Sequence, residues 1–215
     1  MSLSSVCQVF SSHEYYHSMI SNNPFDQLRT EADKGNKKKS YTWYTTQIRN
    51  LGLNKIKPQQ ALKSEIGELV SRVYWGNMYL FMYDPKHKET LPFYDQFPLV
   101  LPFNVIKGGF LGLNIHYLPP LLRVKLLGRL MELASNQVYN ESTRIRMNWD
   151  ILNNAARFPE VRPCVKRYLT SHVRSRFLKV HPKDWKAAIL LPIETFHGSS
   201  KTNVYRNSQE IISNV

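Results

Sequence analysis

The residues His13-Glu14-Tyr15-Tyr16-His17 fit the pattern H-E-x-x-H, which on a helix places two histidines on one face. Such a pair can hold zinc while the glutamate activates a bound water for hydrolysis. The third ligand that a catalytic zinc requires is not supplied by the residues that follow, because the H-x-x-G-x-x-H continuation is missing. We therefore interpret the motif as a polar helix face and expect neither a metal nor another cofactor. A zinc hydrolase stays as a remote alternative.

The other reactive side chains form no recognisable catalytic motif in the sequence. The remaining histidines are scattered and do not suggest a Ser-His-Asp triad. Asp84 and Asp95 flank a strand-rich stretch and would be candidates for a carboxylate pair, but Asp before Pro and a bend after Tyr94-Asp95 favour turns. Gly108-Gly109 lacks the spacing of a phosphate-binding loop. The sequence therefore predicts a protein that is not an enzyme.

Composition points to an anionic partner. The chain has 215 residues, a formal net charge of +13 and an isoelectric point near 9.8, which suits phosphates or an acidic protein surface. No apolar run approaches the roughly 20 residues that span a bilayer, so we expect no membrane partner. The N-terminus lacks the pattern of a signal peptide. Cys7 and Cys164 have no CxxC spacing, which argues against a disulfide framework and favours synthesis in the reducing cytosol.

Basic residues concentrate in one third of the chain. Residues 121–186 contain fourteen Lys and Arg against five Asp and Glu. The guanidinium fork of arginine suits phosphate oxygens, and no helix-turn-helix, zinc-finger or RNP signature is present. We therefore predict contacts to phosphate groups without sequence reading, against the alternative of an ordinary solvated basic surface. The candidate nucleic-acid-binding residues are Arg144, Arg146, Arg162, Lys166, Arg167, Arg174, Arg176 and Lys179, with the basic loop Lys37, Lys38 and Lys39.

The amino-terminal part of the chain favours short helices. A first helix is expected over 25–32. Ser40 is expected to cap a second helix over 41–51, which Gly52 would end. A third helix is expected over 58–69, because proline is favoured in a first helical turn.

Residues 73–118 alternate apolar and polar side chains, which predicts antiparallel strands. Turn residues at 84–88 indicate a hairpin, and a second turn is expected at 107–109. Pro102 and two other prolines forbid one long central strand, because proline cannot donate to a ladder. Short, bent strands of this kind predict a small barrel.

Beyond residue 119 the pattern becomes helical. A stripe of four leucines, Leu122, Leu126, Leu130 and Leu133, predicts an amphipathic helix that leaves Arg123 on its surface. Further helices are expected over residues 143–157, 163–176 and 182–190.

These elements predict one α+β domain over 40–197. Its centre is a small barrel-like antiparallel β module, 73–118, flanked by N-terminal and C-terminal helices. The carboxy-terminal helices form a basic helical part, 119–190. Residues 1–39 are expected to be a partly extended N-terminal segment, and residues 198–215 a polar C-terminal tail.

Several sequence segments resemble those of the DNA end protector, or head-completion, proteins of T4-type tailed phages. The most specific phrases are GNMYLFMYDPK, LPFYDQFPLV and GFLGLNIHYL, which begin at residues 76, 91 and 109. Further similarity lies in SYTWY, YLTSHVRSRF and DWKAAILLPIE, which begin at residues 40, 168 and 184. The resemblance covers roughly residues 40–207 and leaves the H-E-x-x-H motif outside.

The resemblance implies a virion structural protein without catalytic residues. Members of this family complete the filled head and protect the ends of packaged linear DNA from host exonuclease after injection. It implies double-stranded DNA ends as ligand, portal, neck or tail proteins as neighbours in a multi-subunit assembly, and a location in the virion and, during assembly, the host cytoplasm. The alternative is a neck, tail or baseplate protein that binds other virion proteins without DNA, because exposed arginine and aromatic residues also suit protein interfaces.

Overall fold

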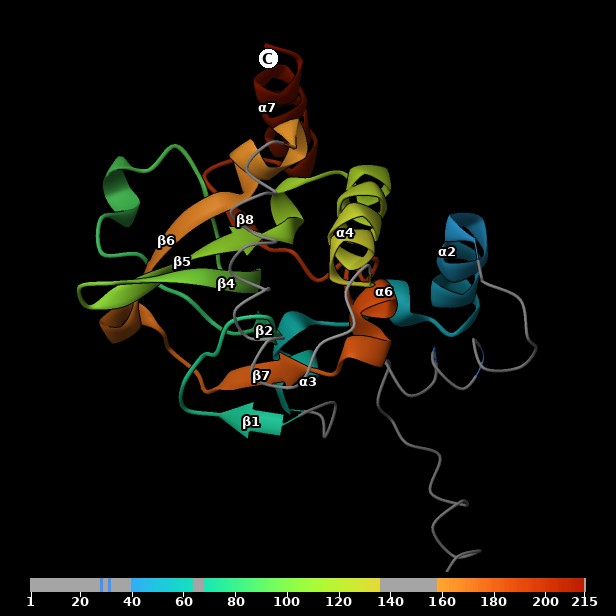
Figure 1. Cartoon of the computed structure of the whole chain (residues 1–215), viewed down its shortest axis with the longest axis horizontal. Helices are drawn as coiled ribbons and strands as arrows, with labels where there is room; N and C mark the ends of the chain where they lie inside the picture. Colours follow the sequence, from blue (N-terminus) through green and yellow to red (C-terminus); the bar gives the residue numbers. More distant parts are fainter. Residues whose placement is uncertain (1–27, 29–30, 32–39, 64–67, 136–157, 215) are drawn as a thin grey trace, which may run out of the picture.

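The computed structural model describes residues 28, 31, 40–63, 68–135 and 158–214. Its centre is a six-stranded antiparallel sheet with the strand order β1-β7-β2-β4-β5-β6 (Figure 1). These strands are β1 (Glu68–Val70), β2 (Met78–Leu80), β4 (Leu99–Ile106), β5 (Gly109–Asn114), β6 (Val165–Leu169) and β7 (Phe177–Val180). A two-stranded sheet pairs β3 (Tyr94–Asp95) with β8 (Phe196–His197).

The α+β class is confirmed, but the barrel is wrong. Strands β1 and β6 form the two edges of the six-stranded sheet and do not pair with each other. A closed barrel needs tilted strands with a staggered register. Strands β1 and β2 have three residues each, which leaves little length for such a stagger.

The hairpin of β4 and β5 is the longest pairing in the sheet. Its turn at 107–108 lies where the sequence predicts it, and Gly108 has φ 75°, in the left-handed region that favours glycine. Pro102 lies inside the eight-residue strand β4, where the predicted bend takes the form of a register shift before Asn104. Strand β2 pairs only with the first two residues of β4, so the missing N–H of Pro102 does not interrupt that ladder.

Alternation along the strands gives the sheet two apolar faces. On β2, Met78 and Leu80 join the larger core, while Tyr79 points to the opposite face. On that second face Phe81 packs edge-to-face against neighbouring rings at centroid distances of 5.0–6.4 Å. The buried members of this aromatic cluster are Tyr79, Phe81, Tyr83, Val100, Phe110, Tyr168 and Phe177.

Helices cover the larger core. Helix α2 (Tyr41–Asn50) begins as predicted, because Ser40 Oγ accepts a hydrogen bond from Trp43 N at 3.1 Å. Helix α4 (Pro120–Ser135) stands between the sheet and α2 and buries Leu126 and its neighbours (Figure 1). The helix predicted over 58–69 is too long. Of the described residues in this range, 58–63 form helix α3 (Pro58–Lys63), and residues 68–70 form edge strand β1.

Within the predicted basic helical part, 119–190, the helix expected over 163–176 is wrong. The 163–176 segment contains the end of η5 (Pro159–Cys164), strand β6 and η6 (Thr170–His172) instead of one helix. Pairing with β5 and burial of Tyr168 in the aromatic cluster outweigh a weak helical preference. The short helix near 182 is confirmed as η7 (Pro182–Asp184) and α6 (Trp185–Ala188).

The segment predicted as a polar tail is ordered into helix α7 (Lys201–Ser213). Ser200 Oγ caps it by accepting a hydrogen bond from Asn203 N at 3.2 Å. Val204 is fully buried, and the helix packs against η5. The polar composition of the segment is therefore compatible with one narrow buried stripe.

Some predicted elements lie outside the described residues. These include the helix over 143–157 and most of the helix over 25–32, of which Leu28 and Glu31 are described as helical. The remaining short elements are η2 (Leu53–Lys55), η3 (Lys88–Thr90) and η4 (Ile115–Tyr117). Among the described residues, no helix has the length and apolar character to cross a membrane. The proposed domain boundaries stay a prediction.

Candidate nucleic-acid interface

The structure describes six of the eleven predicted DNA contacts. Arg162 lies on η5, Lys166 and Arg167 lie on β6, and Lys179 lies on β7. Arg174 and Arg176 precede β7. The other five, together with the H-E-x-x-H motif, lie outside the described residues: Lys37, Lys38, Lys39, Arg144 and Arg146. The six are distributed over η5, β6, β7 and the chain before β7.

Three of the six basic side chains already have partners within the protein. Arg174 lies 3.6 Å from a carboxylate oxygen of Asp84. Lys179 Nζ lies 3.2 Å from Glu68 Oε2 across the β1–β7 pair. Arg176 donates a hydrogen bond to the carbonyl oxygen of Leu69. We call Arg174, Arg176 and Lys179 the paired cations.

Arg162, Lys166 and Arg167 form no ion pair with any other described residue, and we call them the β6 cations. The side chains of Arg162 and Arg167 are exposed. Lys166 Nζ lies 4.0 Å from the ring centroid of Tyr117, a cation–π contact. Burial lowers the pKa of Lys166. The β6 cations are thus the ones best placed to meet an external anion.

A cavity of about 610 Å³ opens beside Lys166 and Arg167. It lies between β6 and a loop over 84–93 that contains η3, and we call it the β6 pocket. The loop is closed by a hydrogen bond from Tyr83 N to the Gln96 carbonyl oxygen, at 2.9 Å. It is fastened to β6 because Leu169 N donates to Tyr83 Oη, at 3.1 Å. These hydrogen bonds therefore hold the two walls of the pocket, the 84–93 loop and strand β6, in place relative to each other.

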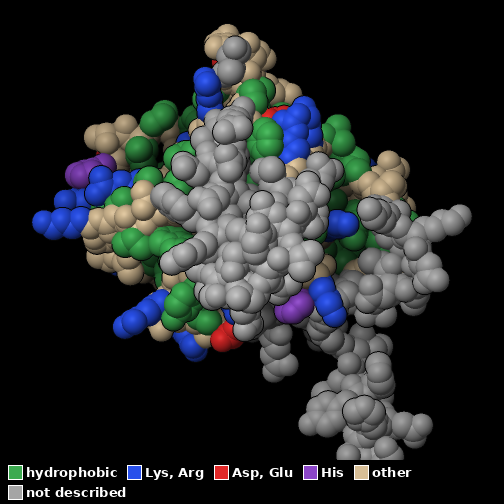
Figure 2. Space-filling view, in the orientation of Figure 1, with side chains coloured by type: hydrophobic (Ala, Val, Ile, Leu, Met, Phe, Trp, Pro, Cys, Tyr) green, Lys and Arg blue, Asp and Glu red, His purple; other side chains and the backbone are tan. Residues whose placement is uncertain are grey.

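The molecular surface around the 84–93 loop is basic and apolar at once. Figure 2 shows Lys, Arg and His side chains at the left margin, over η3 and the end of the β4–β5 hairpin, beside hydrophobic side chains. Lys86 and His87 are exposed and line the β6 pocket, and Leu91 is 41% exposed in the same lining. Phosphate contact and base contact are both compatible with such a surface.

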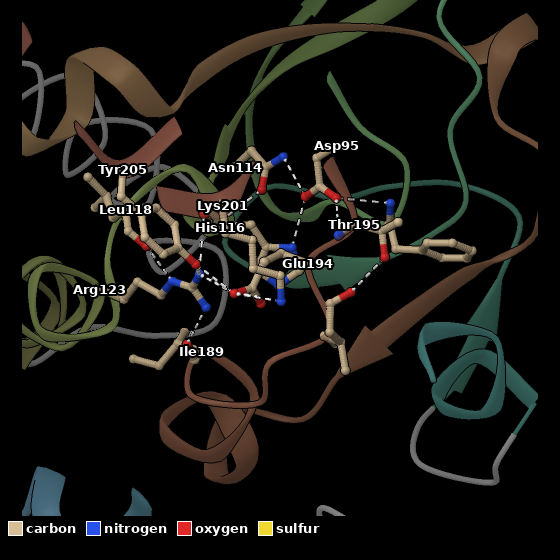
Figure 3. Close-up of polar contacts among 12 residues, drawn as sticks. Asp95, Asn114, His116, Leu118, Arg123, Ile189, Glu194, Thr195, Lys201 and Tyr205 are labelled. Carbon is tan, nitrogen blue, oxygen red and sulfur yellow. Dashed lines mark hydrogen bonds and ion pairs between the residues drawn. The ribbon is translucent and has the colours of Figure 1, made fainter. Parts of the chain in front are cut away.

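A buried carboxylate holds the inner wall of the pocket (Figure 3). Asp95 Oδ2 lies 2.8 Å from His116 Nδ1 and accepts a hydrogen bond from Asn114 Nδ2, at 3.1 Å. Asp95 Oδ1 accepts hydrogen bonds from the backbone N–H groups of Phe97 and Thr195, at 3.1 and 3.2 Å. These contacts join β3, β5, η4 and the chain before β8. The interpretation of Asp95 as a turn residue missed this role.

Arg123 is buried at 1% exposure, so its predicted place on the surface of α4 is wrong. Its guanidinium donates to the carbonyl oxygens of Leu118, Ile189 and His116 at 2.7, 3.0 and 3.2 Å (Figure 3). His116 lies in η4, and Leu118 and Ile189 follow η4 and α6. The buried arginine therefore satisfies carbonyl oxygens in and just after these short helices.

Glu194 completes this buried cluster from the chain before β8. Its Oε1 lies 3.2 Å from Arg123, 3.4 Å from Lys201 Nζ and 2.6 Å from the donating hydroxyl of Tyr205. Burial alone would raise the pKa of Glu194. The positive charge of Arg123 outweighs it, with help from its other neighbours, and lowers that pKa from 4.5 to about 2.

Acid is therefore expected to destabilise the protein in a defined window. The folded-state pKa of Glu194 is depressed, so its contribution, roughly 3 kcal/mol, is full above about pH 4.5 and is lost as pH falls toward 2. Glu194→Gln should lower the free energy of unfolding at neutral pH and flatten its decline below pH 4.5. Urea denaturation across this range, with the exposed Glu210→Gln as control, measures both. Parallel curves for Glu194→Gln and wild type would contradict the assignment.

The described residues contain no group of three or more His, Cys, Asp or Glu side chains arranged to hold a metal ion. Asp84 and Asp95 serve separate contacts, the first with Lys88 at 3.1 Å and the second with His116. Burial raises the pKa of Cys164 to about 12, which leaves an unreactive thiol there. What the described part offers a ligand is therefore positive charge and aromatic surface.

Comparison with known families agrees with this chemistry. The family model described as Phage T4 terminal DNA protecting protein matches residues 19–215. No curated protein and no solved structure matches the chain. The family match contains the whole range of the resemblance found in the sequence and begins after the H-E-x-x-H motif. Because it covers most of the chain and all of its described residues, the protein belongs to the Phage T4 terminal DNA protecting protein family.

Proposed function

We propose that this protein binds the ends of linear double-stranded DNA through the β6 cations and blocks exonuclease access to them. The observation that carries the proposal is that Arg162, Lys166 and Arg167 form no ion pair with any other described residue, and that Lys166 and Arg167 line a pocket with aromatic walls. Membership in a family of DNA-protecting phage proteins supports the same function. The protein would act as a structural component and not as an enzyme.

The mechanism is electrostatic and steric. Each arginine or lysine that neutralises a phosphate releases condensed counterions, which supplies affinity without sequence reading. The body of the sheet and its helices would then occupy the space that an exonuclease needs at the terminus. We place the protein in the virion, and in the host cytoplasm during assembly, as part of a multi-subunit head-completion assembly beside portal, neck or tail proteins.

Binding to DNA of two topologies tests the proposal. A blunt linear duplex and a closed circle of the same sequence are titrated with the full-length protein across a salt series. We expect tighter binding to the linear form and a log–log slope of about −0.9 per phosphate neutralised. Equal binding to both forms would leave only a general phosphate-binding surface. Failure to bind either form would favour a neck, tail or baseplate assembly protein whose basic surface meets acidic protein partners.

A further inference from the structure

We propose that the β6 pocket receives the terminal nucleotide of a DNA end, unstacked from the duplex. This inference rests on the proposed function and adds the part of the DNA that is recognised. The pocket is formed where the 84–93 loop faces edge strand β6. It would let the protein distinguish an end from the interior of a duplex.

The dimensions and the chemistry of the pocket suit a nucleotide. Its volume of about 610 Å³ lies within the range of roughly 300–1,000 Å³ typical of small-molecule sites. One wall is apolar and contains Leu91, Pro92 and Phe93, while the opposite wall carries Lys166 and Arg167. A base would pack on the first wall and its phosphate would meet the second, as in other sites for single-stranded nucleic acid.

Lys166 is the residue that favours an anion most directly. It is partly buried over the Tyr117 ring and has no acidic partner among the described residues. A phosphate oxygen would restore the hydrogen bonds that such an ammonium group loses on leaving water. Lys86 and His87 are exposed and also line the pocket. Further phosphates of the same DNA strand would pass beside these two residues.

Asp95 also lines the pocket but does not oppose an anion there. Both carboxylate oxygens are engaged by the buried donors described above, and the residue is only 3% exposed. The same donors fix the wall of the pocket before any ligand binds. A preformed site of this kind avoids part of the ordering cost of binding.

Preference for an end follows from the cost of unstacking. A base inside a duplex must lose its pairing and two stacking neighbours before it can enter a pocket, whereas a terminal base has one stacking neighbour. Base packing on an aromatic or apolar wall tolerates every base type. The pocket therefore explains selection of DNA ends without sequence preference.

The test places the fluorescent base 2-aminopurine at the terminal or at an internal position of otherwise identical duplexes. Its emission changes when it leaves the base stack. The full-length protein should change the terminal signal and leave the internal one unaltered. A duplex whose ends are closed by hairpin loops should bind about tenfold more weakly than the open duplex.

Leu91→Glu places a negative charge on the apolar wall, at a side chain exposed enough to tolerate it. The matched control is Leu121→Glu, on α4 at 62% exposure and outside the pocket lining. We expect Leu91→Glu to abolish the terminal signal and to weaken end binding about tenfold, with no change for the control. An unchanged terminal signal in Leu91→Glu would overturn the inference. If wild type still prefers linear over circular DNA, the proposed function survives that result, whereas loss of this preference in wild type would refute both.

Discussion

Replacing Arg123 with methionine is expected to lower the free energy of unfolding by about 3–5 kcal/mol. The substitution keeps much of the side-chain volume but leaves Glu194 as a buried carboxylate without its main counter-charge. It also leaves the carbonyl oxygens of Leu118 and Ile189 without their donor. The cost should therefore exceed that of an ordinary surface substitution several times over.

Urea denaturation at neutral pH measures this effect, with Lys125→Met as the matched control. Lys125 lies two residues further along α4, and its exposed ammonium group lies 3.0 Å from the buried carboxylate of Glu160, which also has Arg129 as a partner at 2.9 Å. Loss of that pair should cost less than about 1 kcal/mol. Equal losses for the two variants would show that Arg123 does not organise a buried cluster.

Neutralising the β6 cations should have the largest effect on DNA. The triple variant Arg162→Gln, Lys166→Gln and Arg167→Gln removes three proposed phosphate contacts. We expect the log–log salt slope to become about 2.7 units shallower, and binding to weaken on the order of a hundredfold near 0.1 M salt.

The paired cations supply a control with the same change in net charge. The triple variant Arg174→Gln, Arg176→Gln and Lys179→Gln removes side chains that already contact Asp84, Leu69 and Glu68. Its salt slope should change by less than about one unit. If both triple variants weaken binding equally, net charge alone would account for affinity and the β6 cations would lose their special role.

The parts of the fold that depend on local signals could be predicted from the sequence. The Ser40 cap of α2, the leucine stripe of α4 and the turn before Gly109 each depend on a few adjacent residues. The barrel and the helix over 163–176 are wrong because strand pairing joins residues far apart in the chain. In the sheet, strand β7 lies between β1 and β2, although both of these strands precede it by about a hundred residues in the sequence. No local sequence pattern predicts that pairing.

In the candidate site too, features that depend on nearby residues could be predicted, whereas contacts between distant residues could not. Charge clustering selected Lys166 and Arg167 as candidates, yet it could not separate them from Arg174 and Lys179, whose partners come from the 84–93 loop and β1. Arg123 looks like a surface residue in sequence because its polar neighbours are carbonyl groups, which every residue carries. In retrospect its helical spacing to Leu127 and Leu130 was the available signal.

Protection of an end-labelled linear duplex against a processive exonuclease tests the central claim most directly. The protein is added at a concentration that saturates the DNA, and the survival of full-length duplex is followed with wild type and with the triple variant of the β6 cations. We predict that wild type preserves the duplex and that the triple variant leaves it to be degraded at the rate of free DNA. Degradation at the free rate under saturating wild-type protein would contradict the account, because binding would then occur without protection.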